Sequence, residues 1–357
     1  MNVNEVILSR TVYLKRNLQN YNFALSLSDT KAVEIFHCIE TELQNLESKL
    51  GADYAFTVLP LATIDFLEVR KLQAKRILPY IPKNNIGKGI AFCKKCFVLI
   101  NFDDHITIGK FCDIYNVDFD DEIEVLYKVE NALQENLPFA FDEGMGFLTS
   151  STDDFGTGFI IEFLFSLYFF GNADEYVEKL HKVLGGYFTV QMTERSFDEK
   201  HSSQFIFKIL SGHSHYQTVE SQIQKMFPLI GEAIQNEIND RENFVKNAYD
   251  EAYDFVLRAF LVAKNSILVP EYNFIDLLAT IRFGIAAKMI KNMSLDKIDD
   301  LMIILRTPFI VEAIVAEQSI SMQDVTVKMI DRKRADILRK EFEQVKIKEF
   351  TNDAKFF

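Results

Sequence analysis

Hydrophobic positions in the first two thirds of the chain switch between the period of a helix and that of a strand. Residues 30 to 50 carry apolar side chains three and four positions apart, which predicts an amphipathic helix, and residues 120 to 136 return to this spacing. Between residues 87 and 108, two β-rich runs flank the polar turn Cys93-Lys-Lys-Cys96, which predicts a hairpin. Further strand-like runs cover residues 146–150, 158–169, 186–193 and 204–210. This alternation predicts an α+β fold, an antiparallel sheet with helices packed against it.

The remainder of the chain, after about residue 216, is helical throughout. We therefore expect two domains: the α+β domain over residues 1–239 and an all-α C-terminal domain over residues 240–357. A long helix could cross the boundary near Asn239. Helical spacing covers residues 217–239, 240–265, 272–291, 295–305 and 322–346, with breaks at Pro270, Asn292 and Pro308.

Composition limits the classes of partner. Of the 357 residues, 48% are hydrophobic, a content that suits a packed soluble core. The net charge of -13 opposes general affinity for nucleic acid or an anionic membrane. The most apolar run, residues 159 to 170, contains Glu162 and is too short to span a bilayer. The N-terminal residues show no signal-peptide pattern, so we expect a cytoplasmic protein that binds neither nucleic acid nor membrane.

The four cysteines leave two interpretations open. Cys93 and Cys96 form a single CxxC pair, whereas a structural zinc site needs four ligands and usually two such pairs. Cys112 and His105 are close enough in sequence to contribute further ligands. The alternative is a pair of reduced cysteines beside a hairpin of a cytosolic protein. We expect this second arrangement and no metal site, and the role of Cys93 and Cys96 stays unassigned.

A glycine-turned segment, residues 139 to 158, reads FAFDEGMGFLTSSTDDFGTG. It resembles the active-site core of the ATP:guanidino phosphotransferases, in particular the bacterial protein-arginine kinases, which follow the pattern FDE-x-x-G-[YF]-LTSCPTN-x-GTG-x-RAS. In this alignment Ser151 occupies the position of the family's reactive cysteine. Asp153 and Asp154 replace a threonine and an asparagine, and Ile160 replaces an arginine that clamps phosphate. The resemblance implies the frame of a kinase with altered chemistry.

Two more motifs extend the resemblance toward the N-terminus. The run ILSRTVYLKRNLQNYNF is similar to the family's opening strand, and the alignment puts Thr11 and Tyr13 at two nucleotide-binding arginines. The run NFDDHITI resembles the family's NEEDHLRI. Here Asp103 takes the place of the catalytic acid, one methylene shorter than glutamate, and Thr107 takes the place of a third arginine.

The stretch VQMTERSFDEK aligns with the family's RG-x-x-GE. It puts Gln191, or Thr193 with another gap, at the last arginine, and Asp198 at the second acid. In the family, five arginines surround the ATP phosphates with the help of magnesium, because phosphoryl transfer depends on positioning and charge neutralisation. None of the matched residues here can carry positive charge. The loss of one such donor typically costs about 10²–10³ in rate, so we expect no measurable turnover.

The helical half resembles the protein-arginine kinase branch. LLATIRFGI and KRADILRKEF match segments of its C-terminal domain. In that branch this domain binds phosphoarginine through an adjacent Arg-Asp pair, and the same positions here are Ile330 and Asp331. Only the acid remains, although the neighbouring Arg332 could compensate. Arg332 belongs to a basic cluster with Lys333, Arg334, Arg339 and Lys340. Such a cluster could bind an acidic or phosphorylated partner, but more often it is the solvated face of a terminal helix.

These observations favour a pseudokinase that acts by binding or regulation in protein quality control, with no cofactor. One rival is an active, divergent protein-arginine kinase that uses ATP and magnesium and lines its pocket with other basic residues, such as Arg10, Lys15 and Arg195. Another is a phosphoarginine-binding adaptor that acts through the C-terminal domain. Otherwise we expect surface exposure for Arg10 and Arg195, and packing or salt-bridge roles for Lys15 and Arg16. The resemblance also implies a homodimer and protein partners: a zinc-containing activator, a heat-shock repressor and a Clp-type unfoldase.

Overall fold

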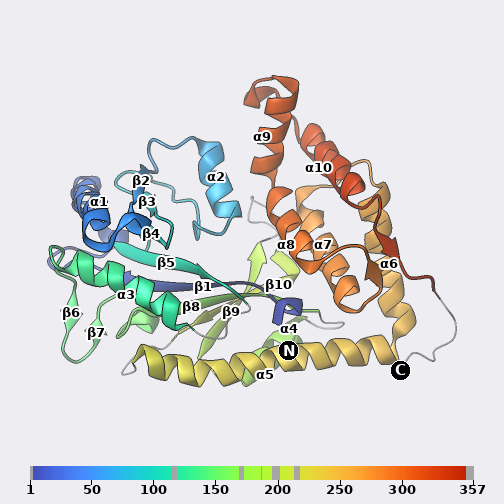
Figure 1. The fold of residues 1–357 in the computed structure, drawn as a ribbon, viewed down its shortest axis with the longest axis horizontal. Helices are drawn as coiled ribbons and strands as arrows, with labels where there is room; N and C mark the ends of the chain where they lie inside the picture. Colours follow the sequence, from blue (N-terminus) through green and yellow to red (C-terminus); the bar gives the residue numbers. More distant parts are fainter. Residues whose placement is uncertain are drawn as a thin grey trace.

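The computed structural model describes residues 3–114, 119–168, 173–185, 187–194, 202–212 and 218–350. An eight-stranded sheet forms one half of the molecule, and a bundle of C-terminal helices packs at one end of this sheet (Figure 1). Every ladder of this sheet is antiparallel. The α+β fold with a helical C-terminal region is therefore confirmed.

The long strand β1 (Ile7–Arg16) lies inside the sheet, between β5 and β8. The strands on one side of β1 come from residues 57 to 112, and those on the other side come from residues 159 to 211. In spatial order the strands are β2 (Thr57–Pro60), β3 (Gly89–Phe92), β4 (Phe97–Ile100), β5 (Ile106–Cys112), β1, β8 (Phe159–Ser166), β10 (Ser202–Ser211) and β9 (Phe188–Glu194).

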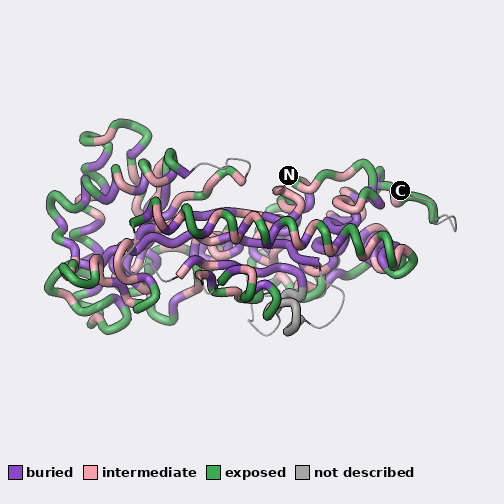
Figure 2. The backbone as a smooth tube through the Cα atoms, turned by 90° about the horizontal axis from the view of Figure 1, so that it is seen from below, coloured by how far each residue is buried: buried purple, intermediate pink, exposed green. Residues whose placement is uncertain are grey.

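One face of the sheet is covered by four helices, α1 (Asp29–Leu50), α3 (Asp120–Gln134), α4 (Ala173–Leu184) and α5 (Val219–Asn247). The helix α1 shows why the sequence pattern works. Its apolar stripe is buried against the strands, the Ser28 hydroxyl accepts the Lys31 amide, and Gly51 ends the helix with φ +95°. Seen from below, α5 runs along the buried strands (Figure 2). The predicted helices over residues 30–50 and 120–136 are confirmed.

The opposite face of the sheet is covered only in part. The helix α2 (Phe66–Ala74), which the hydrophobic pattern did not reveal, packs with a small apolar cluster over β3 and β4. Its Lys71 Nζ donates to Glu312 Oε1 of α9 at 2.7 Å, so it also touches the C-terminal bundle. Figure 1 shows α2 opposite α8 and α9. The uncovered part of this face of the sheet lies between α2 and the helices α8 and α9.

The C-terminal bundle builds a second apolar core, and Leu164 and Phe205 of the sheet join it. The helix α5 spans 29 residues and passes residue 239 without a break, although it contains Pro228. Among the described residues, none of the helices is long and apolar enough for a membrane crossing. The bundle comprises α6 (Tyr249–Asn265), α7 (Glu271–Ala286), α8 (Leu295–Ile304), α9 (Thr307–Gln318) and α10 (Val327–Glu341), with a small sheet of β11 (Ile290–Lys291) and β12 (Lys346–Ile347).

The structure differs from the prediction at residues 146–150, which were expected to form a strand, and at α9, which was not expected. Residues 146–150 do not form a strand of the main sheet. The strand β7 (Gly146–Phe147) pairs with β6 (Phe141–Asp142), and Phe147 also bridges to Gly156. The chain turns at Gly146, with φ +80°, and then caps a short helix. The helix α9 was missed because Pro308 indicated a break. Proline lies there in the first turn, where no amide donor is needed. Short 3-10 helices occupy Val3–Glu5, Ala24–Ser26, Ala52–Tyr54, Thr152–Asp154 and Met322–Asp324.

Candidate functional site

Antiparallel register brings the five predicted nucleotide positions onto one face of the sheet. Residues directly opposite each other in a ladder point to the same side. Lys15 pairs with Thr107, Tyr13 with Ile160, and Lys208 with Gln191. Thr11 faces Glu162, which in turn faces Leu210, two residues from Lys208. The alignment drawn from the sequence thus places these positions on one face of the sheet, opposite the helix-covered side. We call it the open face, although the side chains of Thr11, Thr107 and Ile160 are themselves buried.

A cavity of about 270 Å³ lies on the open face, between the sheet, the end of α2 and the C-terminal bundle. Tyr13, Gln191 and the alternative position Thr193 line it. Three cations also line it: Arg76 follows α2, Arg306 precedes α9, and Lys208 is on β10. Sequence reasoning missed both arginines, because no motif surrounds them and only the packing of α2 against the C-terminal bundle brings them together.

Arg10 does not line this cavity. It alternates with Thr11 along β1 and therefore points into the helix-covered side, where it is only 4% exposed. Its Nη2 donates to the Asp113 carbonyl at 2.8 Å, and its guanidinium lies 4.1 Å from the centre of the Phe119 ring. Both expectations for Arg10, surface exposure and a substitute phosphate ligand, are wrong because of this alternation. Arg195 lies outside the described residues.

Lys15 points to the open face but is held by carboxylates. Its Nζ donates to Asp154 Oδ2 at 2.7 Å and lies 4.0 Å from Asp104 Oδ2. Burial alone lowers the pKa of Lys15, but Asp154 and Asp104 outweigh it, so the pKa is raised. Burial raises the pKa of Asp104. This cation is therefore neutralised within the protein, as the expected salt-bridge role requires.

Asp103, at the family's catalytic position, lies in the turn between β4 and β5. Its Oδ1 accepts the Tyr80 hydroxyl at 2.9 Å, and its carbonyl accepts the Ser150 hydroxyl. Burial and the Asp103 charge raise the pKa of Tyr80, so this donor stays protonated. Asp103 is partly exposed, and its carboxylate is oriented by the segment that lines the cavity. The second predicted acid, Asp198, lies outside the described residues.

The buried side chain of His105 stabilises the same turn between β4 and β5. Its Nδ1 accepts the Leu18 amide at 2.9 Å, which leaves Nε2 to donate to the Asn22 carbonyl at 2.9 Å. The side chain is fully buried, and burial lowers its pKa to about 4. His105 is therefore neutral near pH 7 and positions the turn that carries Asp103.

Ser151, at the family's cysteine position, is exposed and caps a short helix. Its Oγ accepts the amide of Asp153 at 3.3 Å. Asp153 is exposed, whereas Asp154 is buried against Lys15. The segment that resembles the kinase core thus adds two carboxylates at the end of the open face, and one of them is already paired.

The CxxC pair occupies the turn between β3 and β4, as the hairpin prediction requires. The two thiols are free and their sulfurs are 3.6 Å apart. Hydrogen bonds from Cys96 and the backbone lower the pKa of Cys93 to about 7 despite burial, whereas the pKa of Cys96 is raised. Within the described ranges, no group of three or more metal-ligand side chains comes together.

The predicted phosphoarginine positions lie on α10. Asp331 accepts from Arg334 Nη1 at 3.0 Å, and Arg332 is exposed. Arg334 is fully buried and also donates to the carbonyls of Leu305 and Val269, at 2.8 and 2.6 Å. The view of this basic cluster as a solvated face is therefore wrong for Arg334, because carbonyl groups of the bundle bind its guanidinium.

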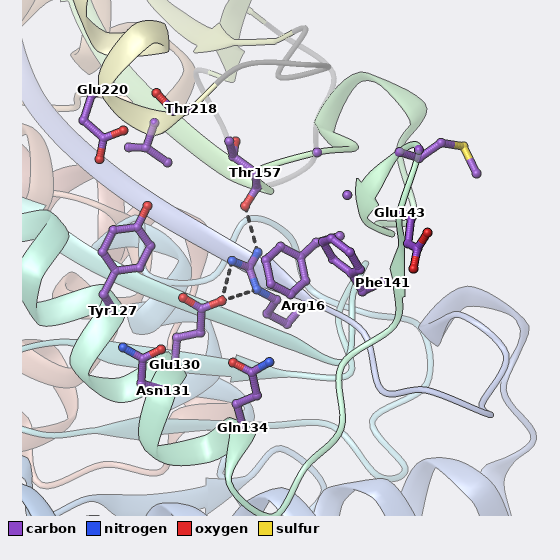
Figure 3. Close-up of a pocket in the computed structure, with 16 residues that line it drawn as sticks. Arg16, Tyr127, Glu130, Asn131, Gln134, Phe141, Glu143, Thr157, Thr218 and Glu220 are labelled. Carbon is purple, nitrogen blue, oxygen red and sulfur yellow. Dashed lines mark hydrogen bonds and ion pairs between the residues drawn. The ribbon is translucent and has the colours of Figure 1, made fainter.

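A second cleft, of about 510 Å³, lies on the helix-covered side between α3, the β6–β7 hairpin and the start of α5 (Figure 3). At its base Arg16 donates to Glu130 Oε1 at 2.6 Å and to the Thr157 carbonyl at 2.8 Å. Both charged side chains are almost completely buried. This confirms the packing role expected for Arg16. The cleft contains none of the predicted site residues.

Comparison with known proteins agrees with this geometry. The model of the ATP:guanido phosphotransferase C-terminal catalytic domain matches residues 37–239, more than half of the chain, and the chain belongs to this family. The model of the protein-arginine kinase McsB C-terminal domain matches residues 250–353. Together these matches confirm the protein-arginine kinase branch that the motifs indicate.

Curated relatives cover nearly the whole chain. A protein-arginine kinase of Clostridium tetani is 25% identical over 345 residues, 94% of this chain and 95% of the relative. One from Bacillus cereus is 23% identical over 311 residues, 84% of each chain. Among solved structures, a duplicated taurocyamine kinase from Schistosoma mansoni (19% identity, TM-score 0.54) matches over 65% of this chain, which spans only 33% of that protein. A lombricine kinase matches with 16% identity, a TM-score of 0.51 and 66% coverage of each chain. These two structures support the fold.

Proposed function

We propose that this protein-arginine-kinase-like chain does not transfer phosphate from ATP and acts instead by binding or regulating other proteins. The resemblance suggests protein quality control as the setting. A homodimer and the partners implied by that resemblance, an activator, a repressor and a Clp-type unfoldase, belong to the same proposal.

The observation that carries the proposal is the composition of the open face. Thr11, Tyr13, Thr107, Ile160 and Gln191 share that face, and none of these side chains supplies a cation. A triphosphate needs preorganised positive donors, because transfer proceeds through an anionic transition state. A hydroxyl or an aliphatic group cannot replace a guanidinium fork. The residues at these positions therefore do not fit an ATP triphosphate held by arginines.

The acids on the same face strengthen this interpretation. Glu162 lines the cavity, and Asp104 and Asp154 surround Lys15. Each carboxylate repels a phosphate group, and the repulsion is strong where water is partly excluded. Lys15 cannot compensate, since its charge is already shared between two acids. Around Lys15 the face thus opposes nucleotide phosphates by charge as well as by lack of donors, whereas the cavity itself also holds cations from outside the matched positions.

One observation favours the rival, an active and divergent kinase. Arg76, Lys208 and Arg306 bring cations to the cavity from outside the matched motifs, and Asp103 keeps a carboxylate nearby. The two functions differ in a measurable product, acid-labile phosphate on a protein arginine.

The test is an arginine phosphorylation assay with the purified chain, MgATP and an unfolded protein substrate. An active protein-arginine kinase, assayed in parallel, controls for the substrate and the detection. We expect no acid-labile phosphoarginine above the level of the Asp103→Ala variant. Phosphoarginine that forms with the wild-type chain and disappears with Asp103→Ala would overturn the proposal and establish the active kinase.

A further inference from the structure

The cavity on the open face has an excess of positive charge that the proposed function does not use. Arg76, Lys208 and Arg306 line it, and Glu162 is the only carboxylate among the lining residues that the structure describes. This leaves two positive charges in excess, although the chain as a whole carries a net charge of -13. Like charges gathered in a partly dry site are unfavourable unless a counter-ion joins them.

The pairing of these cations is uneven. Lys208 Nζ lies 3.2 Å from Glu162 Oε2, and Arg306 Nη1 lies 3.9 Å from Glu271 Oε1. Within the described residues, Arg76 forms no ion pair, and its hydrogen bond goes to the Ser9 hydroxyl at 3.4 Å. Its guanidinium is half-buried. Among the residues that the structure describes, no carboxylate therefore lies within ion-pair distance of the Arg76 guanidinium, although Asp299 and Glu162 are near enough to act on it.

Electrostatics agree with this view. Burial and the nearby Arg306 lower the pKa of Arg76 to about 10, although Asp299 and Glu162 act in the opposite direction. A lowered arginine pKa means that the charged form is disfavoured in this environment. A bound anion would restore the balance.

We propose that this cavity binds a compact dianion of the phosphoryl type, which is held between Arg76 and Arg306 and lies close to Lys208. Guanidinium groups bind phosphoryl oxygens through two parallel hydrogen bonds, which suits a ligand held from two sides. A phosphoryl group supplies the negative charge that Arg76 lacks and that Arg306 and Lys208 receive only in part from Glu271 and Glu162. The volume, about 270 Å³, is below the ~300–1,000 Å³ typical of small-molecule sites, so a single phosphoryl group fits better than a nucleotide.

The position of the site gives binding a structural consequence. Arg76 follows α2 of the sheet domain, and Arg306 precedes α9 of the C-terminal bundle. An anion shared by the two would add a link beside the Lys71–Glu312 pair. A ligand that binds only the folded, assembled state raises the unfolding temperature in proportion to its concentration. The same phosphoryl chemistry could come from free phosphate or from a phosphorylated arginine side chain.

Calorimetry and thermal unfolding with inorganic phosphate test the site in the full chain. We expect saturable binding and a rise in midpoint with phosphate concentration. A parallel titration with phosphoarginine, and with arginine as its control, separates the two sources. Tighter binding of phosphoarginine points to a modified side chain, and equal binding points to the free anion.

Four variants locate the binding. Arg76→Gln and Arg306→Gln each remove a charge-assisted contact and should weaken phosphate binding by about tenfold or more. Glu162→Gln removes the repelling carboxylate and frees Lys208, so it should tighten binding several-fold, a change that damage to the fold would not produce. Arg258→Gln, at an exposed arginine of α6 paired with Asp254, is the matched control and should leave the affinity unchanged.

Two results would overturn the site. One is the absence of saturable phosphate binding up to about 10 mM. The other is binding that responds to none of Arg76→Gln, Arg306→Gln and Glu162→Gln, which would place the anion elsewhere. Circular dichroism of each variant confirms that it is folded. Neither result depends on arginine phosphorylation, so this site and the proposed function can fail separately.

Discussion

The two faces of β1 make opposite use of charge. On the helix-covered side, Val12, Leu14 and Arg16 are buried, and the one charged group among them is paired with Glu130. On the open face, Thr11 and Tyr13 occupy positions where the family resemblance implies arginines, Lys15 is held by acids, and the cations of the cavity come from other elements. The residues that hold the scaffold and the residues at the nucleotide positions can therefore vary independently, even along a single strand.

The largest expected effect tests the scaffold side. Arg16→Met leaves Glu130 buried without its partner, so the free energy of unfolding should fall by about 3–5 kcal/mol. Urea denaturation followed by circular dichroism measures the change. The double variant Arg16→Met/Glu130→Leu should recover part of the loss, because an apolar pair replaces the ions.

Lys128→Met is the matched control for this experiment. Lys128 lies on the same helix as Glu130, and its half-exposed ammonium pairs with Glu124 four residues earlier. Its removal should leave the free energy of unfolding close to that of the wild type, because an exposed ion pair contributes little. A loss below 1 kcal/mol for Arg16→Met, on the order of a surface mutation, would mean that the ion pair is not part of the scaffold.

A pH titration sharpens the same contrast. The pKa of His105 is about 4 in the folded chain and 6.5 for the free side chain, so the unfolded chain binds the proton more readily. Stability is therefore full above pH 6.5 and should decrease as pH falls toward 4, by about 3 kcal/mol. His105→Gln should remove this part of the pH dependence. Equal slopes for the two proteins between pH 6.5 and 4 would show that His105 does not titrate as described.

The smallest effect is expected on the open face. Gln191→Ala replaces an exposed side chain of β9 and should change the free energy of unfolding by less than about 0.5 kcal/mol. Thermal unfolding in phosphate-free buffer measures it. A loss above 2 kcal/mol would mean that this face is part of the packed scaffold, and the contrast between the two faces would be lost.

Prediction from sequence succeeded where local pattern sets structure. The apolar stripe and the caps of α1 specify a helix, and the CxxC turn specifies a hairpin. The expectations for Arg10 were wrong although strand alternation could have corrected them, since a shift of one residue reverses the face of the sheet. Arg76 and Arg306 could not be predicted, because only the contact between two distant segments gives them a common cavity.

The most direct measurement is calorimetric titration of the purified chain with ATP, with and without magnesium, in phosphate-free buffer. The account predicts no saturable heat at micromolar nucleotide and no nucleotide-dependent shift of the unfolding temperature, because the open face offers no arginine cage. Magnesium-dependent binding in the micromolar range would contradict it. In that case the cations around the cavity would be nucleotide ligands, and the active, divergent protein-arginine kinase would be the better account.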